Sequence, residues 1–142
     1  MAKERTLSII KPNAVGRKKV GAIIQMIEEA GFEIIAMRMV RLTKKEAEAF
    51  YYVHKGKDFY ESLTDFMSSG RSVVMVLERE DAIRELRELM GATDPAKAEK
   101  GTIRAKFGEN IERNAIHGSD SPETAAFEVS FFFPDIELLP SR

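Results

Sequence analysis

The spacing of apolar positions changes along the chain between two periods, one typical of strands and the other of helices. Segment 6–11 alternates Leu7 and Ile9 with polar residues and stops before Pro12, which predicts a strand with Lys11 at its end. Further strands are predicted at 32–42, 72–77 and 115–117, and helices at 20–27, 43–51, 59–67, 83–90 and 122–133. Segment 72–77 is almost continuously apolar, which is typical of a central, buried strand.

Residues that begin and end helices support these assignments. Gly31 fits a C-terminal cap after the first helix, and Gly70 ends the helix at 59–67. Thr43 and Glu46 have the capping-box spacing at the start of another helix. Segment 91–114 has no regular pattern. It is too long for an ordinary connection, and loops of that length in compact domains are usually functional.

The order of elements is strand, helix, strand, helices, strand, helix, loop, strand and helix. This order predicts an α+β fold of the ferredoxin-like, split βαβ type, with a four-stranded antiparallel sheet and helices packed on one face. No linker, repeat or low-complexity tract interrupts the pattern, so we expect residues 1–142 to form a single domain. The fold alone does not name a function, because this architecture supports many.

Composition narrows the choice of partners and compartment. The 22 basic and 23 acidic residues nearly balance, so neither a membrane nor a specific nucleic acid is expected as a partner. The N-terminal residues lack a signal-peptide core, and no apolar run approaches the length of a membrane span. The absence of cysteine excludes a disulfide framework and a thiolate metal site, which fits an intracellular protein. We therefore expect a cytoplasmic location.

One of the two histidines, His117, lies in the most constrained segment of the chain, 114–120 (NAIHGSD). An imidazole that is largely uncharged at neutral pH is a nucleophile. Gly118 removes side-chain bulk beside it, and Pro122 with Glu123 marks the start of a helix, whose N-terminus is a natural anion site. These features suggest attack on phosphate. The alternative is a packed or capping histidine.

Four segments, in order, resemble those of the nucleoside diphosphate kinases, and the resemblance covers essentially the whole chain. They are IKPNAV at 10–15, GATDPA at 91–96, GTIR at 101–104 and NAIHGSD at 114–120. The resemblance implies transfer of the terminal phosphate of a nucleoside triphosphate to a nucleoside diphosphate, by a ping-pong route through a phosphohistidine at His117. A covalent intermediate lets donor and acceptor use one site in turn, which suits a nucleophilic histidine.

The resemblance implies that Lys11, Tyr51, Ser119 and Glu128 act with His117. Lys11 and Tyr51 match residues that contact the transferred phosphate. Glu128 matches the carboxylate that holds the histidine ring and fixes which nitrogen carries the proton, and Ser119 supplies a nearby hydroxyl. Without the family, Lys11 is a solvated strand-end charge, Tyr51 a helix-face aromatic and Glu128 a solvated helix carboxylate.

The resemblance also implies a nucleotide-binding set made of Lys11, Phe59, Arg87, Thr93, Arg104, Ile111 and Asn114. Arg87, Thr93 and Arg104 match diphosphate-binding residues, and guanidinium groups suit this role because they pair bidentately with phosphate oxygens. Without the family, Arg87 is one charge on a solvated helix face. The base would stack on Phe59 with Ile111 on its other side, which predicts broad base tolerance. Asn114 matches the residue that contacts the sugar 3′-hydroxyl.

Mg²⁺ is the implied cofactor, because charge on the terminal phosphates must be neutralised as the phosphoryl group moves. The ion is expected to arrive on the nucleotide phosphates, with Asp120 reaching it through water. An alternative makes His117 and Asp120 ligands of a transition metal. His54, the only other histidine, has no comparable sequence setting for that role.

Two positions depart from the family pattern. Arg71 follows Ser69 and Gly70 where proline is usual, and Asp58 precedes Phe59 where proline is common. Both lie outside the residues assigned to chemistry, so they put loop rigidity in doubt and not activity.

Three other functions stay open. An RNA-binding module on this fold would need an aromatic pair on a strand, where the first strand offers Leu7 and Ile9. A catalytically silent relative of the kinases should have lost part of the residue set, and nothing is missing. A phosphatase or mutase that uses phosphohistidine would need a second acid or histidine near the first.

The C-terminal tail carries apolar residues where solvent exposure is otherwise the rule. They are the segment 131–134 (FFFP), Ile136, Leu138, Leu139 and Pro140. Family members form homo-oligomers built from dimers, and we expect the tail to reach a neighbouring subunit, with a tetramer favoured over a hexamer. The alternative is that the tail folds back onto its own core.

Overall fold

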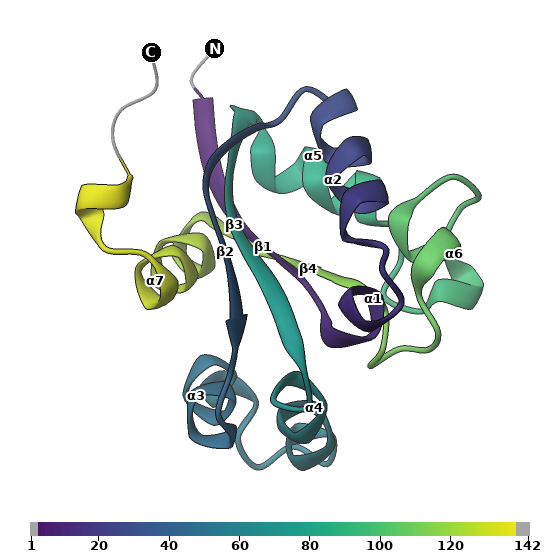
Figure 1. Cartoon of the computed structure of the whole chain (residues 1–142), viewed down its shortest axis with the longest axis vertical. Helices are drawn as coiled ribbons and strands as arrows, with labels where there is room; N and C mark the ends of the chain where they lie inside the picture. The colour runs from purple at the N-terminus through teal and green to yellow at the C-terminus, as the bar shows by residue number, and fades with distance from the viewer. Residues whose placement is uncertain (1–2, 139–142) are drawn as a thin grey trace.

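The computed structural model describes residues 3–138 and contains a four-stranded antiparallel sheet (Figure 1). The strands are β1 (Lys3–Ile10), β2 (Glu33–Arg41), β3 (Arg71–Glu80) and β4 (Ile116–Gly118), in the order β2-β3-β1-β4. β3 pairs with β1 from Lys3 opposite Glu80 to Ile10 opposite Val73, and β4 pairs with the other side of β1. The predicted fold class is confirmed.

The helices are α1 (Pro12–Gly16), α2 (Val20–Glu29), α3 (Lys44–Phe50), α4 (Tyr60–Met67), α5 (Ala82–Met90), α6 (Ile103–Phe107) and α7 (Pro122–Phe132), with 3-10 turns η1 (Tyr52–His54), η2 (Pro95–Lys97) and η3 (Asp135–Glu137). The apolar pattern predicts neither α1 nor α6, and the expectation that 91–114 is irregular is wrong where α6 and η2 form. Both helices have five residues, which is too short for an apolar period to repeat. None of the helices in the described range is long and apolar enough to cross a membrane.

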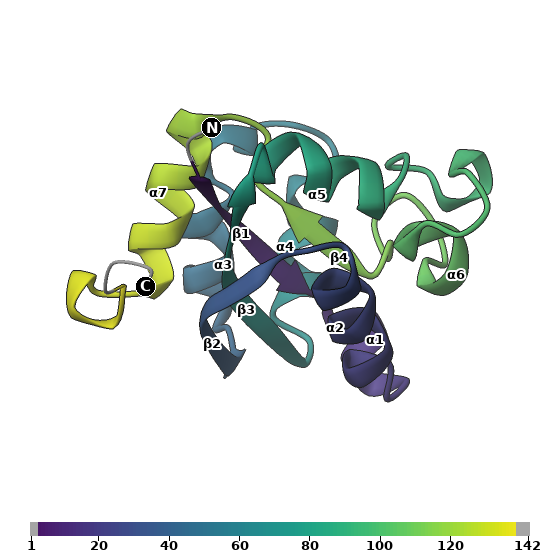
Figure 2. The same ribbon diagram turned by 90° about the horizontal axis from the view of Figure 1, so that it is seen from above.

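Helices cover both faces of the sheet, so the expectation of helices on one face was wrong (Figures 1 and 2). Leu7 and Ile9 of β1 pack in a core cluster with residues of α3, α4 and α7. Ile10 faces the opposite way and packs with residues of α2, α5 and α6. Successive strand side chains point to opposite faces, so a strand covered on both sides must be apolar at nearly every position. β3 is buried from Ser72 to Leu77, as predicted for a central strand.

The predicted helix ends are present. Thr43 and Glu46 form the reciprocal capping box at the start of α3. Gly31 has a φ of 91° just after α2, a left-handed conformation that suits glycine. Ser121 accepts a hydrogen bond from the backbone N–H of Thr124, and Pro122 occupies the first turn of α7.

The first part of the tail folds onto its own chain. Phe132 and Phe133 are buried in the core, and Leu138 packs against the same cluster. Arg5 also donates a hydrogen bond to the Leu138 carbonyl at 3.2 Å. The expectation that these phenylalanines serve a neighbouring subunit is therefore wrong, whereas Ile136 is 81% exposed. Leu139 and Pro140 lie outside the described residues.

Candidate active site

His117 lies on the short edge strand β4, opposite Ile9 of the inner strand β1, so strand pairing fixes its backbone. Its side chain is 19% exposed, which leaves a small part of the ring open to an approaching group. The rings of Phe50 and Tyr51 contact it edge-on, with centroids at 5.6 and 6.3 Å. The imidazole is thus confined by aromatic rings on the α3 side and remains accessible.

Glu128 of α7 accepts a hydrogen bond from the imidazole, with 2.8 Å between His117 Nε2 and Glu128 Oε1. Ser119 Oγ donates to the same carboxylate oxygen at 2.8 Å and itself accepts from the backbone N–H of Leu7 at 3.2 Å. The carboxylate is therefore buried and held in place by a hydroxyl that the sheet anchors. Because Nε2 carries the proton toward Glu128, the lone pair of a neutral ring is on Nδ1. The solvated-carboxylate interpretation of Glu128 is wrong.

Gly118 has a different role from the one expected. A side-chain carbon on Gly118 would lie 2.9 Å from Leu86 Cδ2 and 3.0 Å from Met90 Sδ, both on α5. The space beside this residue is therefore filled by α5 and is not open to a charged group. Glycine is needed at this position because α5 packs directly on β4.

Lys11 comes directly after β1, where it is the N-cap residue of α1. Its backbone N–H donates to the carbonyl of Ala115 at 2.8 Å, and Ala115 has a left-handed backbone with φ 78° just before β4. This contact ties Lys11 to the strand that carries His117. The Lys11 side chain is only 6% exposed, so its interpretation as a solvated charge is wrong.

Burial lowers the pKa of Lys11 to about 7, and the charge on Arg104 adds to this effect. Glu112 acts in the opposite direction, and its backbone carbonyl accepts a weak hydrogen bond from Lys11 Nζ at 3.4 Å. A buried ammonium whose one hydrogen bond within residues 3–138 is this weak contact is suited to an anionic partner, which would restore the charged form.

Arg104 of α6 is also buried. Its Nη1 donates to the Gly91 carbonyl at 3.1 Å, and its Nη2 donates to the Ile116 carbonyl at 2.9 Å. Burial, followed by the charge on Arg87, lowers the pKa of Arg104 to about 10. The guanidinium remains charged at neutral pH. Arg87 lies on the exposed face of α5, close enough for its charge to act on Arg104.

Three buried polar atoms at this site have no hydrogen-bond partner within residues 3–138. They are Tyr51 Oη, Arg104 Nε and Asn114 Oδ1. Asn114 is held by its amide nitrogen, which donates to the carbonyls of Thr93 at 3.1 Å and Ile111 at 2.9 Å. Burial, followed by the charge on Glu128, raises the pKa of Tyr51, so its phenol keeps its proton. Buried polar atoms normally have partners, so these point to a polar ligand.

Phe59 and Ile111 are exposed apolar side chains on separate segments, 46% and 60% exposed. Phe59 is the N-cap residue of α4, and Ile111 lies in the loop before β4. Exposed apolar surface beside a polar site is typical of a ligand-binding cleft.

His54 belongs to this site, although its sequence setting gave no reason to place it there. Its ring centroid is 6.1 Å from Tyr51 and 5.2 Å from Phe59, and Lys57 Nζ lies 3.1 Å from its Nδ1. Burial, followed by the charge on Lys57, lowers the pKa of His54, and Asp120 and His117 also act on it. The 3-10 turn η1 brings His54 here, and no apolar period could have predicted that turn.

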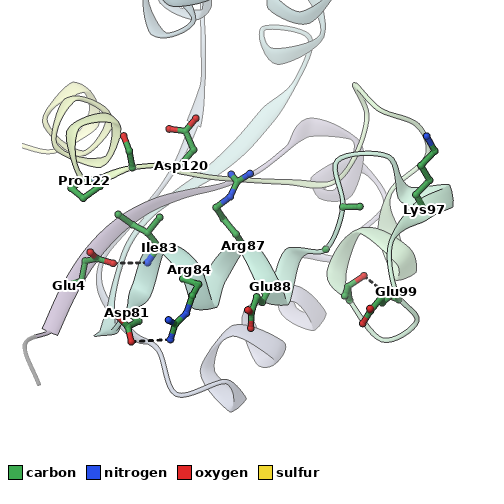
Figure 3. A pocket seen from close by; sticks show the side chains of 14 residues that line it. Glu4, Asp81, Ile83, Arg84, Arg87, Glu88, Lys97, Glu99, Asp120 and Pro122 are labelled. Carbon is green, nitrogen blue, oxygen red and sulfur yellow. Dashed lines mark hydrogen bonds and ion pairs between the residues drawn. The ribbon is translucent and has the colours of Figure 1, made fainter.

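Asp120 is exposed between β4 and α7 and lines a cavity of about 1130 Å³. Figure 3 shows the Arg87 side chain extending toward Asp120 across this cavity, and Thr102 lines it as well. Thr93 is an exposed residue of the segment between α5 and η2. Within residues 3–138, no group of three or more His, Asp or Glu side chains could hold a metal ion. The Asp120 carboxylate on the same cavity as Arg87 fits an ion that arrives with phosphate ligands.

The two departures from the family pattern are both exposed residues. Arg71 is the exposed first residue of β3. Asp58 is exposed in a run of turns in which Lys57 N–H donates to the His54 carbonyl and Tyr60 N–H donates to the Lys57 carbonyl, both at 3.0 Å. These turns show that a hydrogen-bonded loop forms without proline at position 58.

Comparison with known proteins finds one family over almost the whole chain. The family model described as nucleoside diphosphate kinase matches residues 4–138. Nucleoside diphosphate kinases from Nitrosospira multiformis and Geobacter sulfurreducens are 58% and 57% identical over 138 and 136 residues, which cover 97% and 96% of this chain and 98% and 99% of those proteins.

Solved structures lead to the same family. The Aquifex aeolicus nucleoside diphosphate kinase superposes with a TM-score of 0.94 at 46% identity and covers 97% of this chain and 100% of that one. A Halobacterium salinarum nucleoside diphosphate kinase in complex with CDP also gives 0.94, at 36% identity, over 99% of this chain and 94% of that one. The chain therefore belongs to the nucleoside diphosphate kinase family and is an enzyme that transfers phosphate between nucleotides.

Proposed function

We propose that His117 is the residue that carries the phosphate in this reaction. Its Nδ1 attacks the terminal phosphorus of a nucleoside triphosphate, an N–P bond forms, the bridging O–P bond breaks, and the nucleoside diphosphate leaves. A second nucleoside diphosphate then attacks the phosphohistidine and takes the phosphate. The observation that carries this proposal is the hydrogen bond from Nε2 to the buried Glu128, which leaves Nδ1 free on a partly exposed ring.

The phosphate groups are proposed to lie against Lys11, Tyr51, Arg87, Thr93 and Arg104. Lys11 and Tyr51 would contact the transferred phosphate, because one is a buried ammonium and the other a buried phenol whose oxygen has no partner in the described chain. Arg87 and Arg104 would hold the remaining phosphates, since Arg104 Nε is unpaired within that same range. Binding of the diphosphate would offset the mutual repulsion of these two cations.

The nucleoside is proposed to lie with its base between Phe59 and Ile111 and its sugar 3′-hydroxyl on Asn114. Asn114 Oδ1 is buried and has no partner in the described range, so it can accept a hydrogen bond from a hydroxyl. Stacking accepts any base because every base has a π-face, so broad base tolerance follows.

Mg²⁺ is the proposed cofactor, held by the nucleotide phosphates, with Asp120 reaching it through water. When bound, it would neutralise charge on the terminal phosphates. The protein contributes the Asp120 carboxylate, which lines the same cavity as Arg87.

Incubation with ATP and Mg²⁺ followed by intact-mass measurement tests the proposal. We expect the mass of one phosphate to be added, to be lost in acid, and to be transferred when a different nucleoside diphosphate is supplied. A protein that turns over nucleotides without any acid-labile adduct at His117 would contradict the phosphohistidine route.

Glu128→Gln is expected to lower kcat by roughly 10- to 100-fold without unfolding the protein. The amide oxygen can still accept from Nε2, but the negative charge that orients the ring is lost. Steady-state kinetics and thermal unfolding would be measured together, with Ser119→Ala as the companion variant. Normal turnover combined with lower stability would show that Glu128 is only structural.

Phe59→Ala is expected to raise KM for all nucleoside diphosphates by a similar factor, because a lost stack costs about 1–3 kcal/mol whichever base is present. KM would be measured with purine and pyrimidine acceptors. A loss confined to one base would overturn the stacking role.

Nucleotide binding is expected to take up a proton near and above neutral pH. The pKa of Lys11 is about 7 in the free protein, and a bound phosphate favours the charged ammonium and raises that pKa. Affinity should therefore fall as pH rises above 7, by up to about tenfold per pH unit. Calorimetry at pH 8 in buffers with different ionisation heats would measure the proton, and Lys11→Met should not take it up.

Self-association is proposed as well, with a tetramer favoured over a hexamer and the cytoplasm as the location. β2 is an edge strand of the sheet, and it exposes Met37 and Met39. Edge strands offer unpaired backbone groups to a symmetry-related copy. Light scattering of the full chain, of Ile136→Asp and of Met37→Glu would separate a role of the tail from a role of the strand edge, and a monomeric full chain would overturn the proposal.

A further inference from the structure

Two contacts join helix α4 to the loop that precedes β4. Ser62 Oγ donates a hydrogen bond to Glu112 Oε1 at 2.9 Å. The Arg113 guanidinium lies over the Phe66 ring, 4.7 Å from its centroid, a favourable cation–π distance. Ser62 and Phe66 are four residues apart in α4 and therefore share one face of the helix.

These contacts are in register with the two exposed apolar residues of the site. Phe59 precedes Ser62 by three residues, about one helical turn, and Ile111 directly precedes Glu112. Going toward the N-terminus of both segments, Phe66 pairs with Arg113 and Ser62 pairs with Glu112. The next residues on these two segments are Phe59 and Ile111. Both side chains are exposed.

The loop is held as one unit, so a contact at Glu112 also positions Ile111. Asn110 Oδ1 accepts hydrogen bonds from the backbone N–H groups of Glu112 at 3.1 Å and Arg113 at 2.8 Å. The amide of Asn114 donates to the Ile111 carbonyl at 2.9 Å. Because these hydrogen bonds couple residues 110–114, the loop cannot shift at one residue alone.

We propose that Ser62 and Glu112, assisted by the Arg113–Phe66 contact, form a clasp that fixes the distance between Phe59 and Ile111, the two sides of the proposed base site. Both are positioning residues: they act on the base through Phe59 and Ile111 and do not touch the reacting atoms. The inference rests on the proposed function, in which the base lies between those two side chains. Without the clasp, the segments that carry Phe59 and Ile111 must be ordered when nucleotide binds, and the affinity for nucleotide falls.

Glu112 has a second influence that the test must separate from the clasp. Its charge raises the pKa of Lys11, so a change at Glu112 can also alter phosphate binding. Ser62 has no such effect. Inorganic pyrophosphate reports on the phosphate groups alone because it has no base, whereas a nucleoside diphosphate reports on both parts of the site.

The deciding variant is Ser62→Ala, with Ser68→Ala as the matched control. Ser68 ends the same helix, and within the described part of the chain its hydroxyl bonds only to the carbonyls of Thr64 and Asp65 of its own helix. Ser62→Ala should weaken nucleoside diphosphate binding about three- to tenfold and leave pyrophosphate binding and kcat unchanged. Ser68→Ala should change none of these. Glu112→Gln keeps an acceptor oxygen, so it should preserve the ratio of the affinity for the nucleoside diphosphate to the affinity for pyrophosphate.

Hydrogen exchange of the backbone amides at 110–114 gives a readout that needs no nucleotide. Ser62→Ala should speed this exchange, Ser68→Ala should not, and Ser62→Thr should restore it. Unchanged exchange, or equal losses of nucleotide and pyrophosphate affinity, would overturn the clasp. A wild-type protein that forms no phosphohistidine would overturn the proposed function instead, while the exchange result would still decide whether Ser62 holds the loop.

Discussion

His117→Ala is expected to take up no phosphate from ATP and to lose turnover by roughly 10⁴-fold or more, while nucleotide still binds. The covalent route disappears with the imidazole, because the ring supplies the nitrogen that is proposed to attack the phosphorus. Binding survives because Lys11, Arg87 and Arg104 are held by other parts of the chain. Intact mass, steady-state rates and calorimetric titration would measure the three effects.

His54→Ala is the matched control for this variant. His54 is the only other histidine, and its ring lies at the same site against Tyr51 and Phe59. We expect His54→Ala to keep the acid-labile adduct. An adduct that persists in His117→Ala and disappears in His54→Ala would reassign the nucleophile to His54.

Lys11→Met is expected to lower kcat by roughly 10²- to 10³-fold, the usual cost of removing one preorganised group that stabilises transition-state charge. Stability should not fall, because methionine fills similar space and removes the cost of burying an ammonium. Enzyme kinetics and chemical denaturation would be compared with those of Lys106→Met, a change at an exposed lysine on α6. Loss of activity that simply follows loss of folding would contradict a direct role for Lys11.

Local signals in the chain were sufficient for most of the fold. Alternation at Leu7 and Ile9 predicted β1, and the capping box at Thr43 placed the start of α3 within one residue. These signals are short-range: a strand period or a cap depends on residues only a few positions apart. Helices of five residues gave no such signal, and the burial of both faces of the sheet became evident only when all the helices were placed.

The site divides in the same way. The sequence by itself determined which residue types are available, because Lys11, Arg104 and His117 lie in motifs that could be read directly, and Glu128 matches a family position in the last helix. Only the tertiary structure decided the burial, pKa values and hydrogen-bond partners of these residues. Burial lowers the pKa of Lys11 and Arg104, and pairing across 11 positions joins His117 to Glu128.

The same distinction explains the errors. Gly118 looked like an opening for a ligand, but α5 fills that space; His54 looked isolated, but η1 brings it to Tyr51 and Phe59. The phenylalanines before Pro134 looked like an exposed tail, but Phe132 and Phe133 complete the core. Sequence patterns report the chemistry and local periodicity of each residue. Exposure, proton affinity and contact depend on chain segments that are distant in sequence, so the tertiary structure had to decide them.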